Sequence, residues 1–354
     1  MNQQVLFDLR EPAERVRERV ARGSTVILSC SGGKDSTATG LVLKELGIPF
    51  QAIFCDTGWE HQDTYRYLRE DLPGILGPIT WLRCDAPWPD KIRLPMLRRE
   101  NVCTKEEIEQ AERAEALRMR PILEAHAVAI EQLLEVNFSP LVRRALTKAT
   151  MPARVLRWCT QELKFFPARD FLATLDDPIN VVGIRHEESK ARSEMPEWER
   201  DEGLDCDVWR PIIRFTLDDV IAIHKRHGVT PNPLYLKNAS RVGCYPCIFS
   251  RKFEISVLDD RRIEAIRMLE AAVAELAEVR IRRAGNTPEH LPPTFFQSEE
   301  ANPDGSYAWP IDEVIAWSRS TPRGPRKGLP PLMPRDAGCM RWGLCDTSVG
   351  DRDL

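Results

Sequence analysis

Apolar residues in the first part of the chain gather in short runs, each bounded by polar and turn-forming residues. Three of these runs have the length of buried β-strands: residues 24–30, 49–55 and 79–84. Between them, two segments with helical spacing of apolar residues predict helices over residues 35–46 and 61–70. Strands that alternate with helices at this spacing predict an α/β fold, with a parallel sheet and helices on both of its faces.

The pattern changes at Thr104. From there to about residue 150 the apolar spacing predicts helices only, and Thr104 with Glu107 matches a capping box at the start of the first. This segment is interpreted as a helical insertion into the α/β unit. A strand is expected at 179–184, and further helices at 216–228, 259–283 and 311–318. The predicted domains are an α/β domain, residues 1–252, with its insertion at about 104–150, and a C-terminal helical and cysteine-containing region, residues 253–354.

Composition narrows the class of protein. The chain has 354 residues, 42% of them hydrophobic, which is enough for one large domain or two. Its formal net charge of −4 argues against nucleic-acid binding through overall charge alone. No apolar run approaches the roughly 20 residues that span a bilayer, and residues 1–20 do not resemble a secretion signal. We therefore expect a cytoplasmic protein with no membrane partner, in which the 10 cysteines favour metal ligation or thiol chemistry over disulfides.

The sequence SGGKDS, residues 31–36, stands between the first predicted strand and its helix. Gly32 and Gly33 can bring backbone N–H groups close to an anion, and the helix N-terminus points at the same place. Lys34 adds a positive charge, while Ser31 and Ser36 add hydroxyl donors. The spacing differs from the Walker pattern. These residues together predict a phosphate-binding turn; the alternative is a tight corner with a solvated lysine.

This sequence resembles the PP-loop of the ATP pyrophosphatase superfamily, whose members bind the pyrophosphate of ATP and release it while they adenylylate a substrate. Further stretches resemble the phosphoadenylyl-sulfate reductase-like branch: CDTGWEHQDTYRYL (55–68), RWCTQELKFFPARDFL (157–172), GIRHEESKARSE (183–194) and 209–247. Taken without the resemblance, the first could be another βα turn and the third a surface charge run. The resemblance covers about residues 24–250 and implies the N-type, adenine nucleotide alpha hydrolase-like fold.

The resemblance also implies roles for individual residues. Lys34 would stabilise the leaving pyrophosphate, Asp35 or Asp56 would help to hold Mg²⁺, and Arg185 and Arg192 would clamp phosphate or the activated substrate. The four predicted catalytic residues are Lys34, Asp35, Arg185 and Arg192. The predicted nucleotide-binding residues are Ser29, Ser31, Gly32, Gly33, Lys34, Asp35, Ser36, Asp56, Thr57, Gly58, Lys164, Gly183, Arg185, Glu188 and Ser189.

Five cysteines are candidate metal ligands. Cys244 and Cys247 form C-x-x-C, a pattern that by itself fits zinc, an iron–sulfur cluster or a redox dithiol. The related adenylyl-sulfate reductases hold a cluster with such a pair and with two adjacent cysteines near the position of Cys159. This chain has one cysteine there, so a [4Fe–4S] cluster would need a fourth thiolate, for which Cys345 is predicted and Cys339 is the alternative. Zinc and no metal remain the alternative interpretations.

The other cysteines and two histidines receive simpler interpretations. We expect five cysteines to be small residues of the hydrophobic core rather than metal ligands: Cys30, Cys55, Cys84, Cys103 and Cys206. His224 and His227 lie three residues apart on a predicted helix, and we expect them to be cations at its C-terminal end rather than metal ligands.

Two departures from the true sulfonucleotide reductases favour ATP cleavage to AMP and pyrophosphate. The loop keeps SGGKDS, and the tail lacks their Glu-Cys-Gly-hydrophobic-His segment. The resemblance then extends to the sulfur-transfer ATPases of DNA phosphorothioation systems and to iron–sulfur tRNA thiolases, which implies a nucleic-acid substrate and a cysteine desulfurase as sulfur donor. The basic residues of 141–169 fit such a substrate, or equally a solvated helix face. The alternatives are a sulfonucleotide reductase and a sulfate adenylyltransferase-like nucleotide-binding subunit.

Overall fold

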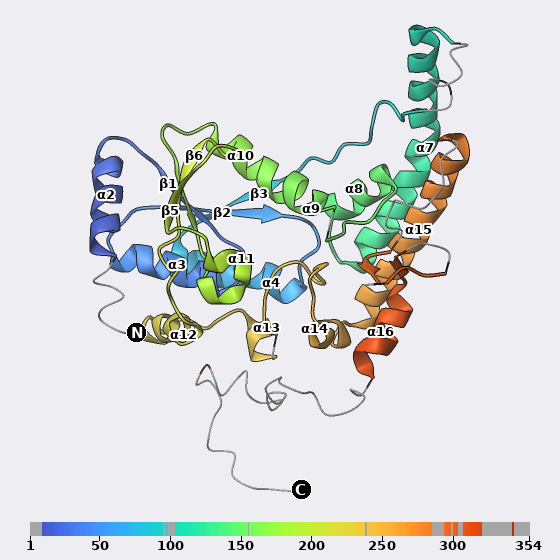
Figure 1. The fold of residues 1–354 in the computed structure, drawn as a ribbon. Helices are drawn as coiled ribbons and strands as arrows, with labels where there is room; N and C mark the ends of the chain where they lie inside the picture. Colours follow the sequence, from blue (N-terminus) through green and yellow to red (C-terminus); the bar gives the residue numbers. More distant parts are fainter. Residues whose placement is uncertain are drawn as a thin grey trace, which may run out of the picture.

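The computed structural model describes most of the chain (Figure 1). The described residues are 9–94, 97, 103–154, 156–237, 239–284, 294–298, 300–303, 307–320 and 342. An α/β part, at left in Figure 1, adjoins a helical part at right. No helix within the described residues is long and apolar enough to cross a membrane.

The central sheet has six strands in the order β3-β2-β1-β4-β6-β5. The strands are β1 (Val26–Ser29), β2 (Gln51–Asp56), β3 (Ile79–Arg83), β4 (Ile179–Val182), β5 (Trp198–Asp201) and β6 (Cys206–Trp209). All neighbours are parallel except β5 and β6, which pair antiparallel. The strand order reverses between β1 and β4. In open α/β sheets ligands bind at this switch point, beyond the carboxyl ends of the strands.

Helices cover both faces of the sheet, as predicted. Side chains alternate along each strand, so Leu28 and Phe54 enter a core formed with α2 (Arg10–Ala21), α3 (Lys34–Glu45) and α12 (Leu217–Arg226). Ile27 and Ile53 enter the core on the opposite face, which α10 (Phe166–Leu172) closes with Leu172. The α/β fold with a mostly parallel sheet is therefore confirmed.

The predicted insertion consists of two helices joined by a short connection, and it packs on the C-terminal helices. It forms α7 (Lys105–Leu133) and α8 (Pro140–Lys148), and the expected capping box is present, with the Glu107 N–H donating to Thr104 Oγ1 at 3.2 Å. One hydrophobic core joins them to α14 (Lys252–Ser256), α15 (Asp260–Ala284) and α16 (Ile311–Arg319). The boundary at residue 252 stays a prediction, but the insertion and the residues after that boundary share this core.

Several elements, among them α2, were not expected from the sequence, and three differences bear on the site. The helix expected at 61–70 runs on to Leu76, as α4 (Gln62–Arg66), η1 (Tyr67–Asp71) with π-helical bonding, and α5 (Leu72–Leu76). A continuous helical segment, α9 (Trp158–Thr160), η2 (Gln161–Phe165) and α10, lies where no element was predicted. The β5–β6 hairpin was also missed, because the charged edge strand β5 lacks an apolar run.

Glu270 of α15 holds the C-terminal segments together. Its carboxylate accepts the N–H of Phe295 at 2.9 Å and that of Ile311, the first residue of α16, at 3.0 Å. The side chain is only 8% exposed, and burial raises the pKa of Glu270 to about 7. The folded protein therefore keeps a proton that the unfolded chain releases at lower pH.

The stability that this proton contributes is expected to be fully present below the ordinary glutamate pKa of 4.5 and lost as pH rises to about 7. Urea unfolding of the wild type and Glu270→Gln at pH 5 and pH 8 measures it. Relative to the variant, the wild type is expected to lose on the order of 2–3 kcal/mol over this range, since one pKa unit corresponds to about 1.4 kcal/mol. Equal pH dependence of the two proteins would contradict the assignment.

Candidate nucleotide-binding site

The SGGKDS loop joins β1 to α3 and brings together the residues predicted for it. Gly33 is the N-cap of α3, and Gly32 has a φ of +70°, a conformation that side-chain-bearing residues rarely adopt. The Ser31 and Ser36 hydroxyls lie 3.2 Å apart, and Ser31 Oγ accepts the Gly33 N–H at 3.3 Å. Two hydroxyls and the first N–H groups of a 12-residue helix thus converge at the switch point of the sheet.

Three charged side chains are buried at this loop, two from the loop itself and one from Arg185. Lys34 Nζ is 3.2 Å from Asp35 Oδ2, and Arg185 Nε is 2.6 Å from Asp35 Oδ1. Lys34 is 8% exposed and Arg185 only 4%. Burial lowers the pKa of Arg185, but Asp35 and Glu187 outweigh it, so this pKa lies above its ordinary value. Two cations held by one buried carboxylate at a helix N-terminus favour an incoming anion.

The segment after β4 packs directly against the loop. Gly183 lies so close to α3 that a Cβ on it would come within 2.7 Å of both Asp35 O and Thr39 Oγ1. Glu188 accepts the Arg185 N–H at 2.8 Å and pairs with Arg192, while Ser189 Oγ accepts the Arg192 N–H at 3.3 Å. Arg185 therefore reaches the loop, whereas Arg192 lies at the edge of the motif, with its side chain 35% exposed.

Three residues hold the loop from behind, of which only His224 was considered from the sequence, and in another role. Asn232 Nδ2 donates to Gly32 O at 3.2 Å, and His224 Nε2 lies 2.9 Å from Lys34 O. The Tyr235 hydroxyl accepts the Lys34 N–H at 3.2 Å, and its ring lies 4.9 Å from Lys34 Nζ. They lie about 200 positions after the loop, and only their place inside the matching stretch 209–247 could have indicated them.

His224 corrects a prediction. It was expected to be a cation at a helix end, but it is fully buried and burial lowers its pKa, so the ring is neutral at pH 7. His227, in contrast, lies at the end of α12 with Nε2 2.7 Å from Glu45. Trp342, the one described residue of the tail, packs edge-on against His224 at 5.1 Å between ring centroids.

Asp56 and its neighbours form a buried network at the end of β2. Asp56 Oδ1 accepts the Gly58 N–H and the Tyr65 hydroxyl, both at 2.9 Å, while Oδ2 accepts Arg83 Nε at 2.9 Å. The Asp56 side chain is 1% exposed. The predicted contact of Asp56 with Mg²⁺ would require breaking these bonds, so the network indicates an anchoring role. Gly58, at φ +67°, lets the chain pass against Ser139.

Cys159, Cys244 and Cys247 lie in one neighbourhood with Lys164. Burial raises the pKa of Cys244 to about 11, and both other thiols add to this effect while Lys164 opposes it. The pKa of Lys164 is raised, chiefly by Cys244. Cys244 Sγ also lies 3.9 Å from Glu60 Oε1. Lys164, predicted to contact the nucleotide, thus lies beside the cysteines.

The metal prediction remains untested by this geometry. Among the residues that the structure describes, no three or more His, Cys, Asp or Glu side chains are arranged to hold a metal ion. Cys345 and its alternative Cys339 lie outside the described residues. Of the cysteines expected in the core, Cys30 and Cys206 are buried, whereas Cys55, Cys84 and Cys103 are only half-buried.

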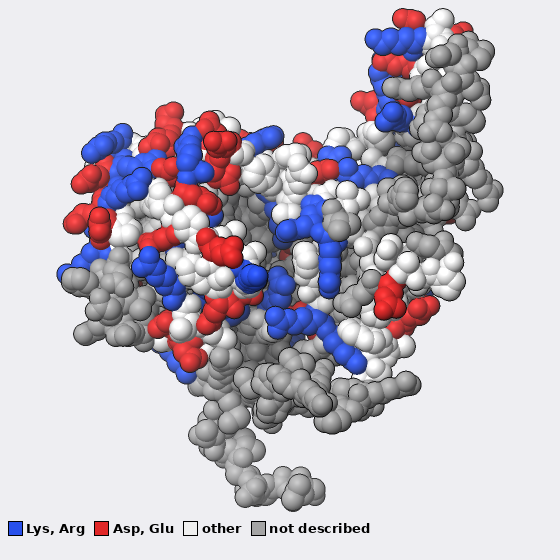
Figure 2. Space-filling model, in the orientation of Figure 1, with Lys and Arg blue, Asp and Glu red and all other residues white. Residues whose placement is uncertain are grey.

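The basic stretch 141–169 does not form one continuous free patch. Arg143 pairs with Glu131 at 2.9 Å, and Arg169 pairs with Asp170 at 2.6 Å. Glu162 pairs with both Arg144 and Lys148. Arg154 and Arg157 remain exposed, each over the ring of Phe249. Figure 2 shows one face of the molecule, on which Lys and Arg side chains gather at the middle, between the α/β and helical parts.

Comparison with known proteins points to one family. The family model described as phosphoadenosine phosphosulfate reductase domain matches residues 25–71 and 112–250, just over half of the chain. An uncharacterized 37.8 kDa protein of Escherichia phage 186 is 36% identical over 289 residues, 78% of this chain and 80% of that protein. The adenosine 5'-phosphosulfate reductase of Allochromatium vinosum is 32% identical over 100 residues, 28% of this chain and 37% of that protein. The phosphoadenylyl-sulfate reductase of Candida auris aligns with a TM-score of 0.40 at 15% identity, covering 70% of this chain and 97% of that one.

Proposed function

Because the chain belongs to the phosphoadenosine phosphosulfate reductase family, we propose that it binds ATP at the SGGKDS loop and cleaves it to AMP and pyrophosphate. The observation that carries the proposal is the intact loop with Lys34 buried at the N-terminus of α3. A ligand without a pyrophosphate would not need this combination of two glycines, two hydroxyls and an ammonium.

In the proposed reaction an acceptor oxygen attacks the α-phosphorus of ATP. A new P–O bond forms, the bond between the α-phosphorus and the bridging oxygen breaks, and pyrophosphate leaves with the bond's electron pair. The Lys34 ammonium and the positive N-terminal end of the α3 dipole would stabilise the charge on this leaving group. Arg185 would hold phosphate from the opposite side, and Asp35, which contacts both cations, fixes their positions.

The adenylylated acceptor is proposed to be a nucleic acid, DNA or tRNA, in which sulfur then displaces AMP. The terminal sulfur of a persulfide, formed by a cysteine desulfurase, would be the nucleophile that displaces AMP. A second thiol would then cleave the S–S bond, which leaves one sulfur on the acceptor and forms a disulfide between the two thiols. The support is the resemblance to sulfur-inserting ATP pyrophosphatases and the neighbourhood of cysteines next to the loop. The Glu60–Cys244 β-bridge joins that neighbourhood to the end of β2.

The chemistry of the cysteines as thiol donors, rather than their arrangement, supports a [4Fe–4S] cluster in this proposal. Cys159, Cys244 and Cys247 would supply three thiolates, and Lys164 would stabilise their negative charge. Cys345 is the proposed fourth ligand, with Cys339 as the alternative. Trp342 lies three residues from each, within about 10 Å of extended chain, and packs with Val242, two residues before Cys244. When bound, the cluster would hold or deliver sulfur; zinc would instead be structural.

A second candidate is a sulfonucleotide reductase, favoured by the family itself and by the adenosine 5'-phosphosulfate reductases among the relatives. Such an enzyme would release sulfite from an adenylyl sulfate at the expense of a thiol and would leave ATP untouched. The intact loop is the reason that ATP cleavage is preferred.

One experiment separates the two candidates. Protein purified anaerobically is assayed for pyrophosphate release from ATP with Mg²⁺, for sulfite release from adenylyl sulfate with thioredoxin, and for iron and sulfide. Pyrophosphate release with about four irons per chain is the expected result. Sulfite release without ATP use would establish the reductase instead, and an iron-free protein that cleaves ATP would remove the cluster.

A further inference from the structure

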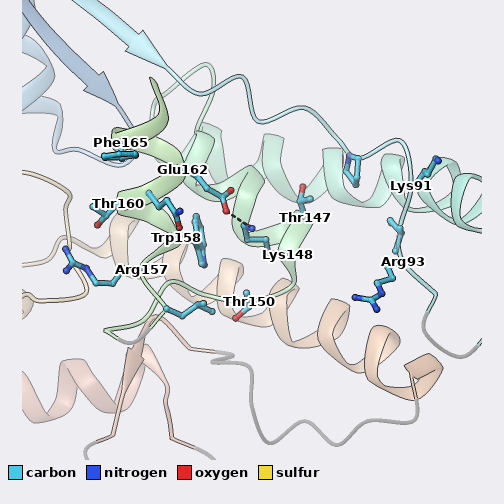
Figure 3. Close-up of a pocket in the computed structure, with 14 residues that line it drawn as sticks. Lys91, Arg93, Thr147, Lys148, Thr150, Arg157, Trp158, Thr160, Glu162 and Phe165 are labelled. Atoms are coloured by element: carbon cyan, nitrogen blue, oxygen red, sulfur yellow. Dashed lines mark ion pairs between the residues drawn. The ribbon is translucent and has the colours of Figure 1, made fainter. Parts of the chain in front are cut away.

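A cavity of about 1,040 Å³ opens on the helical side of the cysteine neighbourhood (Figure 3). Its walls come from residues 89–93 and, more than 50 positions later, from the end of α8 with Thr150 and residues 156–165. Trp158 and Thr160 both line it, and they flank Cys159 in the chain. The cavity therefore adjoins the proposed cluster. None of its lining residues belongs to the SGGKDS loop.

The lining is positively charged. It contains four basic residues and one acidic residue: Lys91, Arg93, Lys148, Arg157 and Glu162. The two lysines are already paired, Lys148 with Glu162 at 2.8 Å and Lys91 with Glu109. Arg93 and Arg157 form no ion pair with any residue that the structure describes. Figure 3 shows these two arginines at opposite ends of the cavity, so they can contact successive charges of an elongated ligand.

Aromatic and polar groups lie between the two arginines. Trp158 is 5% exposed, and its buried indole N–H lacks an acceptor among the described residues. A buried donor of this kind costs stability unless a ligand or water satisfies it. Phe165 is half-buried and contributes a ring to the lining. Guanidinium groups for phosphates and rings for bases are the two elements by which proteins bind single-stranded nucleic acid.

We propose that this cavity binds a short single-stranded segment of a nucleic acid and presents it beside Cys159. The inference deepens the proposed function, since the bound strand would be the acceptor of sulfur. Arg93 and Arg157 bind phosphates at the two ends, the Trp158 N–H donates to a base or phosphate oxygen, and Phe165 stacks on a base. A duplex is disfavoured because its bases are stacked inside and cannot reach the rings.

The test is fluorescence anisotropy of a labelled 12-nucleotide single strand, DNA and RNA in turn, without ATP. The double variant R93Q/R157Q is compared with R22Q/K225Q, which removes the same charge from two exposed positions, one at the C-cap of α2 and one on α12. The cavity variant is expected to bind at least tenfold more weakly than the wild type. The slope of log K against log salt should fall by about 1.4, since each single-strand phosphate contact contributes about 0.7. The control variant should match the wild type.

Equal losses in the two double variants, or tighter binding of a duplex than of its single strand, would overturn the proposal. Trp158→Phe provides a second measurement, since it keeps a ring but removes the N–H, and it should weaken strand binding while leaving thermal unfolding close to that of the wild type. Because the assay contains no ATP, a failure of the wild type to release pyrophosphate would count against the proposed function and not against this cavity.

Discussion

Replacing Lys34 with alanine is expected to lower the rate of pyrophosphate release by about 10²–10³-fold, the usual cost of losing one preorganised charge-stabilising group. Lys34 Nζ is held at the loop by Asp35 at 3.2 Å and by the Ser240 carbonyl at 3.4 Å, on the face of Tyr235. The ammonium is thus positioned before the nucleotide arrives. Because its charge acts most strongly on the leaving pyrophosphate, the loss should fall mainly on kcat.

Lys44 on the same helix is the matched control, because it is exposed and lies at the far end of α3 from the loop. Lys44→Ala should release pyrophosphate at the wild-type rate. Lys34→Ala also removes a buried partner of Asp35, so thermal unfolding of the variant must be measured beside its kinetics. A folded Lys34→Ala protein that retains turnover within twofold of the wild type would remove the loop from the proposed chemistry.

One segment, residues 232–247, links the SGGKDS loop to the cysteines. Asn232 contacts the backbone of Gly32, and Tyr235 contacts the backbone of Lys34. The Ser240 carbonyl accepts a hydrogen bond from the Lys34 ammonium. A few residues later the Tyr245 N–H donates to Trp59 O at 2.9 Å, next to the Glu60–Cys244 bridge. A movement of the loop on nucleotide binding would therefore reach the C-x-x-C pair through a short, hydrogen-bonded stretch of chain.

The sequence predicted the elements that depend on local pattern. The apolar runs and the SGGKDS turn correctly placed the first three strands and α3, because strand burial and helix capping act over a few residues. The structure adds what depends on long-range pairing. Nothing near Lys34 indicates that a histidine and a tyrosine about 200 positions later fix its backbone.

The pairing of charges is a second property that the sequence does not show. The stretch 141–169 looks basic because Glu131 and Asp170, which neutralise two of its arginines, lie just outside the stretch. Arg93, which lies outside the stretch, and Arg157, which lies inside it, form no ion pair with the described residues, and both line one cavity. His224 illustrates the same limit, since its burial behind the loop, and so its neutral state, comes from packing between distant segments.

Replacing Gly183 with alanine is expected to damage both stability and nucleotide binding. The new Cβ would lie 2.7 Å from Asp35 O and 2.7 Å from Thr39 Oγ1, distances that force α3 and the end of β4 apart. Overpacking of this kind costs about 1–3 kcal/mol. Because Asp35 O belongs to the first turn of α3, the displacement also moves the N–H groups of the loop, and ATP should bind at least tenfold more weakly.

Gly74→Ala is the matched control, since a Cβ there meets nothing within 4 Å and the residue lies in the short helix α5. Alanine at that position should leave ATP binding unchanged and raise stability by about 0.4–1 kcal/mol. Calorimetric titration with ATP and urea unfolding of both variants give the two measurements. If Gly183→Ala keeps wild-type stability and affinity, the contact between β4 and α3 does not position the loop, and Arg185 must reach the phosphates independently of it. If Gly183→Ala weakens ATP binding but keeps wild-type stability, the added Cβ displaces the loop without weakening the packing of β4 on α3.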